Sequence, residues 1–282
     1  MAATWLRMHG ECTPRLLEAI QIDWTLLHGD RERSFLVHVP SGYDPARPTP
    51  VVLNFHGRGS TAQQQITVSH MVALSNDEGF VAVHPVGVGQ TFNAGLCCGE
   101  AMESGVDDVG FTSAILDALR SSLCIDPGRV YATGLSNGGF MAHRLACDLA
   151  DRIAAIGPVA GSNGTIGCSP SRPVPVFHFH GTADTIVPYD GFAGQLAVPA
   201  TMEAWAARNG CGATSSVFFE EGDVRCEEWT GCADDATVRL CTIDGGGHQW
   251  PGGTTIPLLG PNTDVISASQ MMWDFFEAHP MP

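Results

Sequence analysis

The chain has 282 residues, of which 44% are hydrophobic and 16% are charged. That apolar content supports a packed core and excludes a wholly disordered chain, while no stretch reaches the roughly 18 apolar residues of a transmembrane helix. The formal net charge of −16 disfavours binding to nucleic acid or to an anionic membrane.

Short apolar runs rich in β-branched residues predict strands that alternate with helical patterns along the chain. Strands are expected at residues 35–39, 51–55, 80–84, 130–135, 153–159, 174–179 and 238–243, with a weaker candidate at 217–220. Helices are expected after a cap at Asp107 or Asp108, and around Phe140, Met202 and Met272. This alternation predicts an α/β fold with a mostly parallel central sheet that helices cover on both faces.

The sequence shows no internal repeat and no linker. We therefore expect one domain over residues 30–282 and an N-terminal extension of unknown role over residues 1–29. Residues 1–12 lack the apolar core of a signal peptide, which indicates either a leader already removed or a cytoplasmic protein.

Ten cysteines are many for a chain of this length, and none stands in the CxxC spacing of zinc ribbons and thioredoxin-like proteins. This pattern favours a secreted, extracellular protein with disulfide bonds, in which Cys226 and Cys232 would close a short loop. The alternative is a set of free thiols buried as small apolar side chains.

The pattern Gly134-Leu135-Ser136-Asn137-Gly138 is the strongest chemical signal in the sequence. A predicted strand precedes it and a helical pattern follows it, which is the context of a nucleophile elbow, a sharp turn that exposes a serine hydroxyl. Glycines suit this turn because a side chain at position 134 or 138 would crowd the neighbouring chain. All 14 basic residues are arginine, so a Ser-Lys dyad is excluded.

A nucleophilic Ser136 needs a histidine base and an acid that orients it, both downstream in the chain order Ser, acid, His. His248 is the expected base, because it lies in a loop after the strand at 238–243, at the sheet edge where such chemistry occurs. Asp184, which follows the strand at 174–179, is the expected acid. Its rivals are Asp190, Asp223 and Asp244.

Two backbone N–H groups are needed to hold the oxyanion of the tetrahedral intermediate. Asn137, directly after the nucleophile, would supply one, and Arg58, in the glycine-rich loop after the strand at 51–55, would supply the other. His178 and His180 could bind a metal, but an HxH pair without a third ligand is more often structural, so no metal site is expected.

Four motifs stand in order along the chain: Asn54-Phe55-His56-Gly57, residues 134–139, His180-Gly181-Thr182-Ala183-Asp184 with Val187-Pro188-Tyr189, and residues 245–252. Together they resemble the secreted polyhydroxybutyrate depolymerase and feruloyl esterase family of α/β-hydrolases, over about residues 30–280. The resemblance implies the α/β-hydrolase fold, Ser136, Asp184 and His248 as catalytic residues, and the amides of Asn137 and Arg58 as oxyanion donors. It also implies export, no metal or cofactor, and activity on esters of hydroxy acids or hydroxycinnamates. This chain departs from the family at Arg58, where many relatives carry Cys, and at Phe92, where relatives often carry Trp.

Trp250, Phe92 and His56 are the candidates for substrate contact. Trp250 would stack on a ring of the substrate or only pack its loop, and packing beneath the loop is the favoured role of His56. Farther along, Ile256, Leu258 and Leu259 would form an apolar wall near the site or anchor their loop to the core.

The sequence thus predicts a serine carboxylic-ester hydrolase that acts through an acyl-enzyme, most readily on feruloyl or related plant-cell-wall esters. The alternatives are an extracellular polyhydroxybutyrate depolymerase, an acyltransferase on the same fold, and a binding protein that has kept the fold without catalysis. The expected partner is a small-molecule or polymeric ester, and the expected state is a monomer or a dimer.

Overall fold

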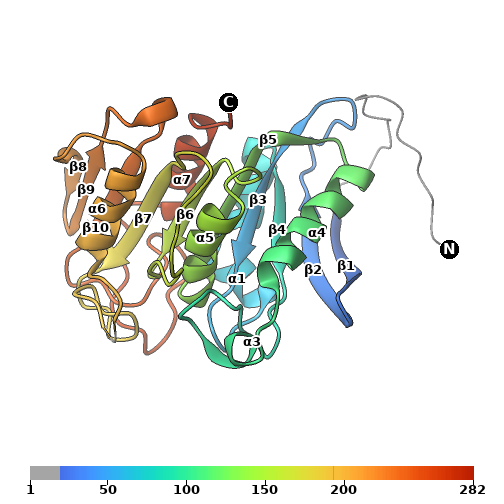
Figure 1. Ribbon diagram of the computed structural model, residues 1–282, viewed down its shortest axis with the longest axis horizontal. Coiled ribbons are helices and arrows are strands. Elements are labelled where there is room, and N and C mark those ends of the chain that lie inside the picture. Colours follow the sequence, from blue (N-terminus) through green and yellow to red (C-terminus); the bar gives the residue numbers. More distant parts are fainter. Residues whose placement is uncertain (1–19, 193) are drawn as a thin grey trace.

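In the computed structural model, which describes residues 20–192 and 194–282, the strands form one ten-stranded sheet in the order β1-β2-β4-β3-β5-β6-β7-β10-β9-β8 (Figure 1). The strands are β1 (Ile20–His28), β2 (Arg31–Val39), β3 (Thr49–Phe55), β4 (Val81–Pro85), β5 (Ile125–Leu135), β6 (Ala155–Val159), β7 (Val176–Gly181), β8 (Ser216–Glu221), β9 (Val224–Trp229) and β10 (Val238–Ile243). The central run from β4 to β10 is parallel, and the pairs toward both edges are antiparallel. The predicted mostly parallel sheet is confirmed.

Helices cover both faces of this sheet, as the alternating pattern predicts. They are α1 (Ala62–Ser69), α2 (Met71–Glu78), α3 (Gly99–Glu103), α4 (Asp108–Ser122), α5 (Asn137–Asp148), α6 (Val198–Arg208) and α7 (Ala268–Glu277). On one face, α4, α5 and α6 bury residues such as Phe111, Leu145 and Trp205, and these helices stand in front of the sheet in Figure 1. On the other face, α2 and α7 bury Met71 and Trp273 in a second apolar cluster. Burial on both faces explains why β3, β4, β6 and β7 are fully apolar or buried along their length.

Several elements were not predicted from the sequence. Strand β1 lies within residues 1–29 and pairs with β2 from Ile20 opposite Val39 to His28 opposite Arg31. Strand β9 and helices α1 to α3 were also missed, whereas the predicted cap of α4 is confirmed, since the Asp107 carboxylate accepts the Gly110 N–H at 2.8 Å. No helix among the described residues is both long and apolar enough to cross a membrane.

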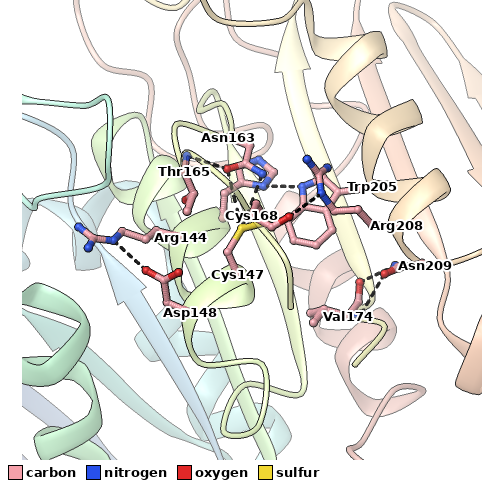
Figure 2. The surroundings of a disulfide bond; sticks show 11 residues. Arg144, Cys147, Asp148, Asn163, Thr165, Cys168, Val174, Trp205, Arg208 and Asn209 are labelled. Carbon is pink, nitrogen blue, oxygen red and sulfur yellow. Dashed lines mark hydrogen bonds and ion pairs between the residues drawn. A yellow bond between two sulfur atoms is a disulfide. The ribbon is translucent and has the colours of Figure 1, made fainter. Parts of the chain in front are cut away.

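The disulfides of the described residues join Cys97 to Cys98, Cys147 to Cys168, Cys211 to Cys232, and Cys226 to Cys241, which confirms that disulfides form. The predicted short loop from Cys226 to Cys232 is wrong, because Cys226 on β9 lies directly opposite Cys241 on β10 in the antiparallel register. Figure 2 shows Cys147, near the end of α5, bonded to Cys168, whose carbonyl accepts a hydrogen bond from Arg208 of α6. The disulfide therefore anchors the segment between β6 and β7 to α5, and the hydrogen bond from Arg208 connects the same segment to α6.

Candidate active site

Ser136 lies in the sharp turn between β5 and α5, with φ 58° and ψ −120°. A non-glycine residue rarely adopts this backbone, which is favourable only where the surrounding structure enforces it. The Ser136 N–H donates to the Val159 carbonyl at 2.9 Å, and the Ser136 carbonyl accepts the Phe140 N–H at 2.9 Å. A Cβ added at Gly138 would collide with the Phe55 carbonyl, and one at Gly134 would come within 2.5 Å of the same oxygen. The glycines of the motif thus let the turn pass close to β3 and present the hydroxyl.

His248 and Asp184 meet at the carboxyl end of the sheet, as their positions after β10 and β7 predict. The His248 Nδ1–H donates to Asp184 Oδ2 at 2.6 Å, and the Asp184 side chain is completely buried. Asp184 Oδ1 accepts the backbone N–H groups of Ile186 at 2.8 Å and Val187 at 2.9 Å. These hydrogen bonds fix both oxygens of the carboxylate.

Two of the three rival carboxylates have other partners. Asp244 accepts the Thr182 hydroxyl at 3.1 Å, and Asp223 accepts the Thr263 hydroxyl at 2.7 Å. Among the described residues, the carboxylate that contacts His248 is therefore that of Asp184.

Two imidazoles keep the Asp184 carboxylate ionised. Burial by itself would raise its pKa, but the nearby His180 imidazole, the hydrogen bond from His248 and the Val187 N–H hold the pKa well below its usual range. An ionised Asp184 can only accept at Oδ2, so His248 carries its proton on Nδ1. Nε2 of His248 is then the nitrogen left to act as a base.

The backbone amides of Arg58 and Asn137 are available as donors. Neither makes a hydrogen bond within the part of the chain that the structure describes, and Asn137 is the first residue of α5, where N–H groups have no intrahelical partner. The side chain of Asn137 is fully engaged, since Oδ1 accepts the Phe92 N–H at 2.7 Å and Nδ2 donates to the Phe92 carbonyl at 2.9 Å. The residue after the predicted nucleophile thus holds the backbone of Phe92.

Gln249, the residue after His248, makes the same kind of contact on the other side of the site. Its Oε1 accepts the Ile256 N–H at 2.9 Å, and its Nε2 donates to the Ile256 carbonyl at 2.9 Å and the Gly260 carbonyl at 2.8 Å. Two side-chain amides therefore each bind a loop backbone next to a predicted catalytic residue.

A cavity of about 910 Å³ opens over this site, and both Ser136 and His248 line it. Its walls are mostly apolar and come from several segments, with Val68 of α1, Leu96, Ile186 and Ile256 as representatives. No Asp or Glu side chain lines the cavity among the described residues, and its titratable side chains are Arg58 and His248. The buried Oε1 of Gln195, also in the wall, has no hydrogen-bond partner in the described part of the chain. The cavity thus suits an apolar group.

The three predicted substrate-contacting side chains are fully buried and do not line this cavity, so that prediction is corrected. Trp250 Nε1 donates to Ser269 Oγ at 3.0 Å within the core beneath α7. His56 Nδ1 donates to the Gly57 carbonyl at 2.8 Å, His56 Nε2 accepts the Gly87 N–H at 3.0 Å, and Phe92 packs on the imidazole. His56 therefore packs beneath the glycine-rich loop that contains Arg58, which is the role that the sequence favoured.

The wall predicted from the late apolar loop is confirmed in part. Ile256 and Leu259 line the cavity, whereas Leu258 is fully exposed. The walls from α1 and from Ile186, Val187, Phe192 and Gln195 were missed, because no spacing in the sequence indicates that they lie beside Ser136.

His178 and His180 hydrogen-bond to each other, with 2.9 Å between His178 Nε2 and His180 Nδ1. Within the described ranges, no group of three or more His, Cys, Asp and Glu side chains is placed to hold a metal ion.

No family model matches the chain. Over 268 residues the chain is 32% identical to feruloyl esterase B of Piromyces equi, which covers 89% of this chain and 46% of that protein. Over 249 residues it is 30% identical to the putative esterase NocK of Nocardia uniformis subsp. tsuyamanensis, which covers 79% of this chain and 72% of that protein. The solved acetyl xylan esterase from Aspergillus awamori matches with a TM-score of 0.62 at 16% identity, over 86% of this chain and 94% of that one.

The chain therefore spans less than half of the length of feruloyl esterase B and most of the length of the putative esterase. The structural match shows a common fold, with the central parallel sheet and its two helical layers. The chain belongs to the feruloyl esterase family of the α/β-hydrolase superfamily.

Proposed function

We propose that the protein is a serine carboxylic-ester hydrolase in which Ser136, His248 and Asp184 act as a catalytic triad. The observation that carries this proposal is the 2.6 Å hydrogen bond from His248 to the buried Asp184, beside a cavity that Ser136 also lines. The triad also needs a hydrogen bond from Ser136 Oγ to His248 Nε2. Catalytic hydrogen bonds are often long in the free enzyme, and we propose that this one forms when substrate binds.

In this mechanism His248 Nε2 takes the Ser136 proton while Oγ attacks the ester carbonyl. The Asn137 and Arg58 amides hold the oxyanion of the tetrahedral intermediate, and Asp184 stabilises the imidazolium. His248 then gives the proton to the departing alcohol, which leaves an acyl group on Ser136. Water, activated by the same imidazole, releases the acid and restores the enzyme.

We propose feruloyl or other hydroxycinnamoyl esters of the plant cell wall as substrates. The apolar cavity matches an aromatic acyl group. The names of the relatives, a feruloyl esterase and an acetyl xylan esterase, support the same class of polysaccharide esters.

We further propose that residues 30–282 form the catalytic domain, with β1 from the preceding segment added at the edge of the sheet. The disulfides of the described residues support an extracellular location, because such bonds persist in oxidising compartments.

The test is product release from methyl ferulate, acetylated xylan and amorphous polyhydroxybutyrate, measured side by side by chromatography. We expect ferulate release, and we expect Ser136→Ala to lower turnover by a factor on the order of 10⁶, as in the subtilisin precedent. Release of hydroxybutyrate alone would indicate a polyhydroxybutyrate depolymerase instead of a feruloyl esterase. An ester product formed only with an acceptor alcohol would indicate an acyltransferase. Full activity in Ser136→Ala would refute the mechanism.

A further inference from the structure

Three buried histidines and a tryptophan extend from Asp184 into the core of the face covered by α5 and α6. His178 and His180 share one side of β7, His143 is on α5, and Trp205 is on α6. All four are at most 1% exposed. Their rings follow one another at centroid distances of 5.2 Å from His180 to His178, 5.5 Å from His178 to His143, and 6.0 Å from His143 to Trp205. We call these four residues the histidine stack.

At the end nearest the active site, the direction of the hydrogen bonds is determined by the acceptors. His180 Nε2 lies 2.8 Å from the Val187 carbonyl and 3.4 Å from Asp184 Oδ2. Both oxygens only accept, so His180 carries a proton on Nε2, which donates to the Val187 carbonyl and lies beside Asp184 Oδ2. His180 Nδ1 faces His178 Nε2 at 2.9 Å, which positions the His180 ring from behind.

At the far end the direction is determined by a donor. The indole N–H of Trp205 can only donate, and it lies 3.0 Å from His143 Nδ1. Burial, with the charge of Arg208 nearby, lowers the pKa of His143 to about 3, so His143 is neutral and carries its proton on Nε2. The stack thus has a defined tautomer at both ends.

We propose that His180 is a positioning residue of the catalytic site, which donates its Nε2–H to Asp184 Oδ2 and so fixes the acid for its contact with His248. The inference rests on the proposed function, because it takes Asp184 as the acid of the triad. Oδ2 then receives two imidazole donors, His248 from the cavity side and His180 from the core side.

The donation has an electrostatic consequence. A hydrogen bond to an ionised oxygen stabilises the carboxylate more than its protonated form. Loss of the His180 donor would therefore favour uptake of a proton by the coupled Asp184–His248 pair, whichever of the two groups holds it. The acid limb of kcat/KM, which reports that proton uptake, would move to higher pH.

Other titratable or charged groups near the Asp184–His248 pair also influence the pH dependence of kcat/KM. His178 and His180 come from β7, His143 from α5 with Arg208 of α6 near it, and Tyr189 packs edge-on against His180 with its hydroxyl 2.8 Å from Thr242. Burial lowers the pKa of His178 well below its usual value, so His178 stays neutral over the range of the assay.

A matched pair of variants separates positioning from packing. The amide nitrogen of glutamine can occupy the place of histidine Nε2, whereas that of asparagine occupies the place of Nδ1. We expect His180→Gln to keep the donor to Asp184 and an acid limb close to the wild type. We expect His180→Asn to move that limb up by about one pH unit, with kcat lowered roughly tenfold or more and KM little changed.

His84→Asn is the control, because His84 on β4 is just as buried but has no hydrogen bond to the site. Its acid limb should coincide with that of the wild type, whatever its melting temperature. An unshifted limb in a folded His180→Asn would overturn the proposal, and so would equal shifts in all three variants.

Should the variants fail to fold, ¹⁵N NMR of the histidines in the wild-type protein provides the test. His180 is expected as the tautomer with a proton on Nε2, in slow exchange with solvent. An Nε2 without a proton would overturn the proposal. This outcome does not depend on activity, so it can be distinguished from failure of the esterase mechanism, which the Ser136→Ala assay addresses.

Discussion

The two sides of the active site are held in different ways. On the side of the nucleophile, backbone conformation and the absence of side chains at Gly134 and Gly138 position Ser136. On the side of the acid, hydrogen bonds between side chains position Asp184, and the carboxylate is completely buried. Substitution should therefore affect the two sides differently: on one side the hydroxyl can be removed without disturbing the turn, and on the other each exchange leaves buried polar atoms without partners.

The largest effect that tests this comparison is expected from Asp184→Asn. The amide would still fill the space, but its N–H₂ group can face His248 Nδ1 and favour the wrong tautomer of the base. We expect kcat to fall by a factor on the order of 10⁴, as in the protease precedent. Near-full activity, measured on methyl ferulate with Asp223→Asn as the control, would assign the acid elsewhere.

The second effect concerns acid and the histidines of the core. Burial lowers the pKa of both His84 and His143 from 6.5 to about 3. The unfolded chain therefore binds more protons than the folded one between these values, so stability is complete above pH 6.5 and declines as the pH falls toward 3. The slope is about 1 kcal/mol per pH unit for each histidine.

Melting temperatures recorded from pH 7 to pH 4 should show this decline. His84→Phe removes one of these titrating groups and should make the decline shallower. A variant curve parallel to that of the wild type would mean that His84 is not titrating as its burial implies.

A third effect should come from the side held by the backbone. Gly138→Ala adds a Cβ that would collide with the Phe55 carbonyl, so the elbow must shift or the protein must lose stability by about 1–3 kcal/mol. Gly42→Ala, where nothing lies within 4 Å of the added atom, is the matched control. Chemical denaturation and turnover, measured on both, would show whether the turn tolerates the methyl group; equal results for both variants would contradict the steric account of the elbow.

The smallest effect concerns Arg58, whose guanidinium lies at a cavity that no described carboxylate lines. Arg58→Gln should lower kcat/KM for monomethyl glutarate relative to dimethyl glutarate by about tenfold or less, because an exposed ion pair contributes about 1 kcal/mol or less. The ratio of the two substrates cancels any change in the backbone donor. Arg31→Gln, at the start of β2, removes the same charge away from the cavity and should leave the ratio unaltered.

The parts of the fold that sequence predicts are those buried on both faces. Strands such as β3 and β7 are buried along their whole length because helices cover both sides of them, and most of their residues are apolar. Strand β9 (Val224–Trp229) escaped prediction because charged residues occupy half of its positions, and its disulfide partner was missed with it. In β1, Trp24 and Leu26 do alternate with polar residues, and this period of two was a signal that could have identified the strand.

The site divides in the same way. Ser136, Asp184 and His248 lie in the turn or loops that follow β5, β7 and β10, so the order of the strands predicts that they converge. The walls of the cavity depend on where loops and α1 pack, for which the sequence has no spacing rule. Trp250 is an example. Its closeness to His248 in the sequence suggested contact with the substrate, but its ring is buried in the core.

The two amide side chains of Asn137 and Gln249 have a consequence for how substrate preference can diverge among relatives. Each residue directly follows a proposed catalytic residue and hydrogen-bonds to the backbone of a segment that contributes to the cavity wall, at Phe92 in one case and at Ile256 in the other. A loop of different length would strain the hydrogen bonds of Asn137 or Gln249 and so displace the neighbouring Ser136 or His248. Substitution of individual side chains, such as Leu96 or Leu259, leaves both sets of hydrogen bonds intact. Substrate preference on this scaffold should therefore diverge by substitution of side chains in the cavity wall rather than by changes in loop length.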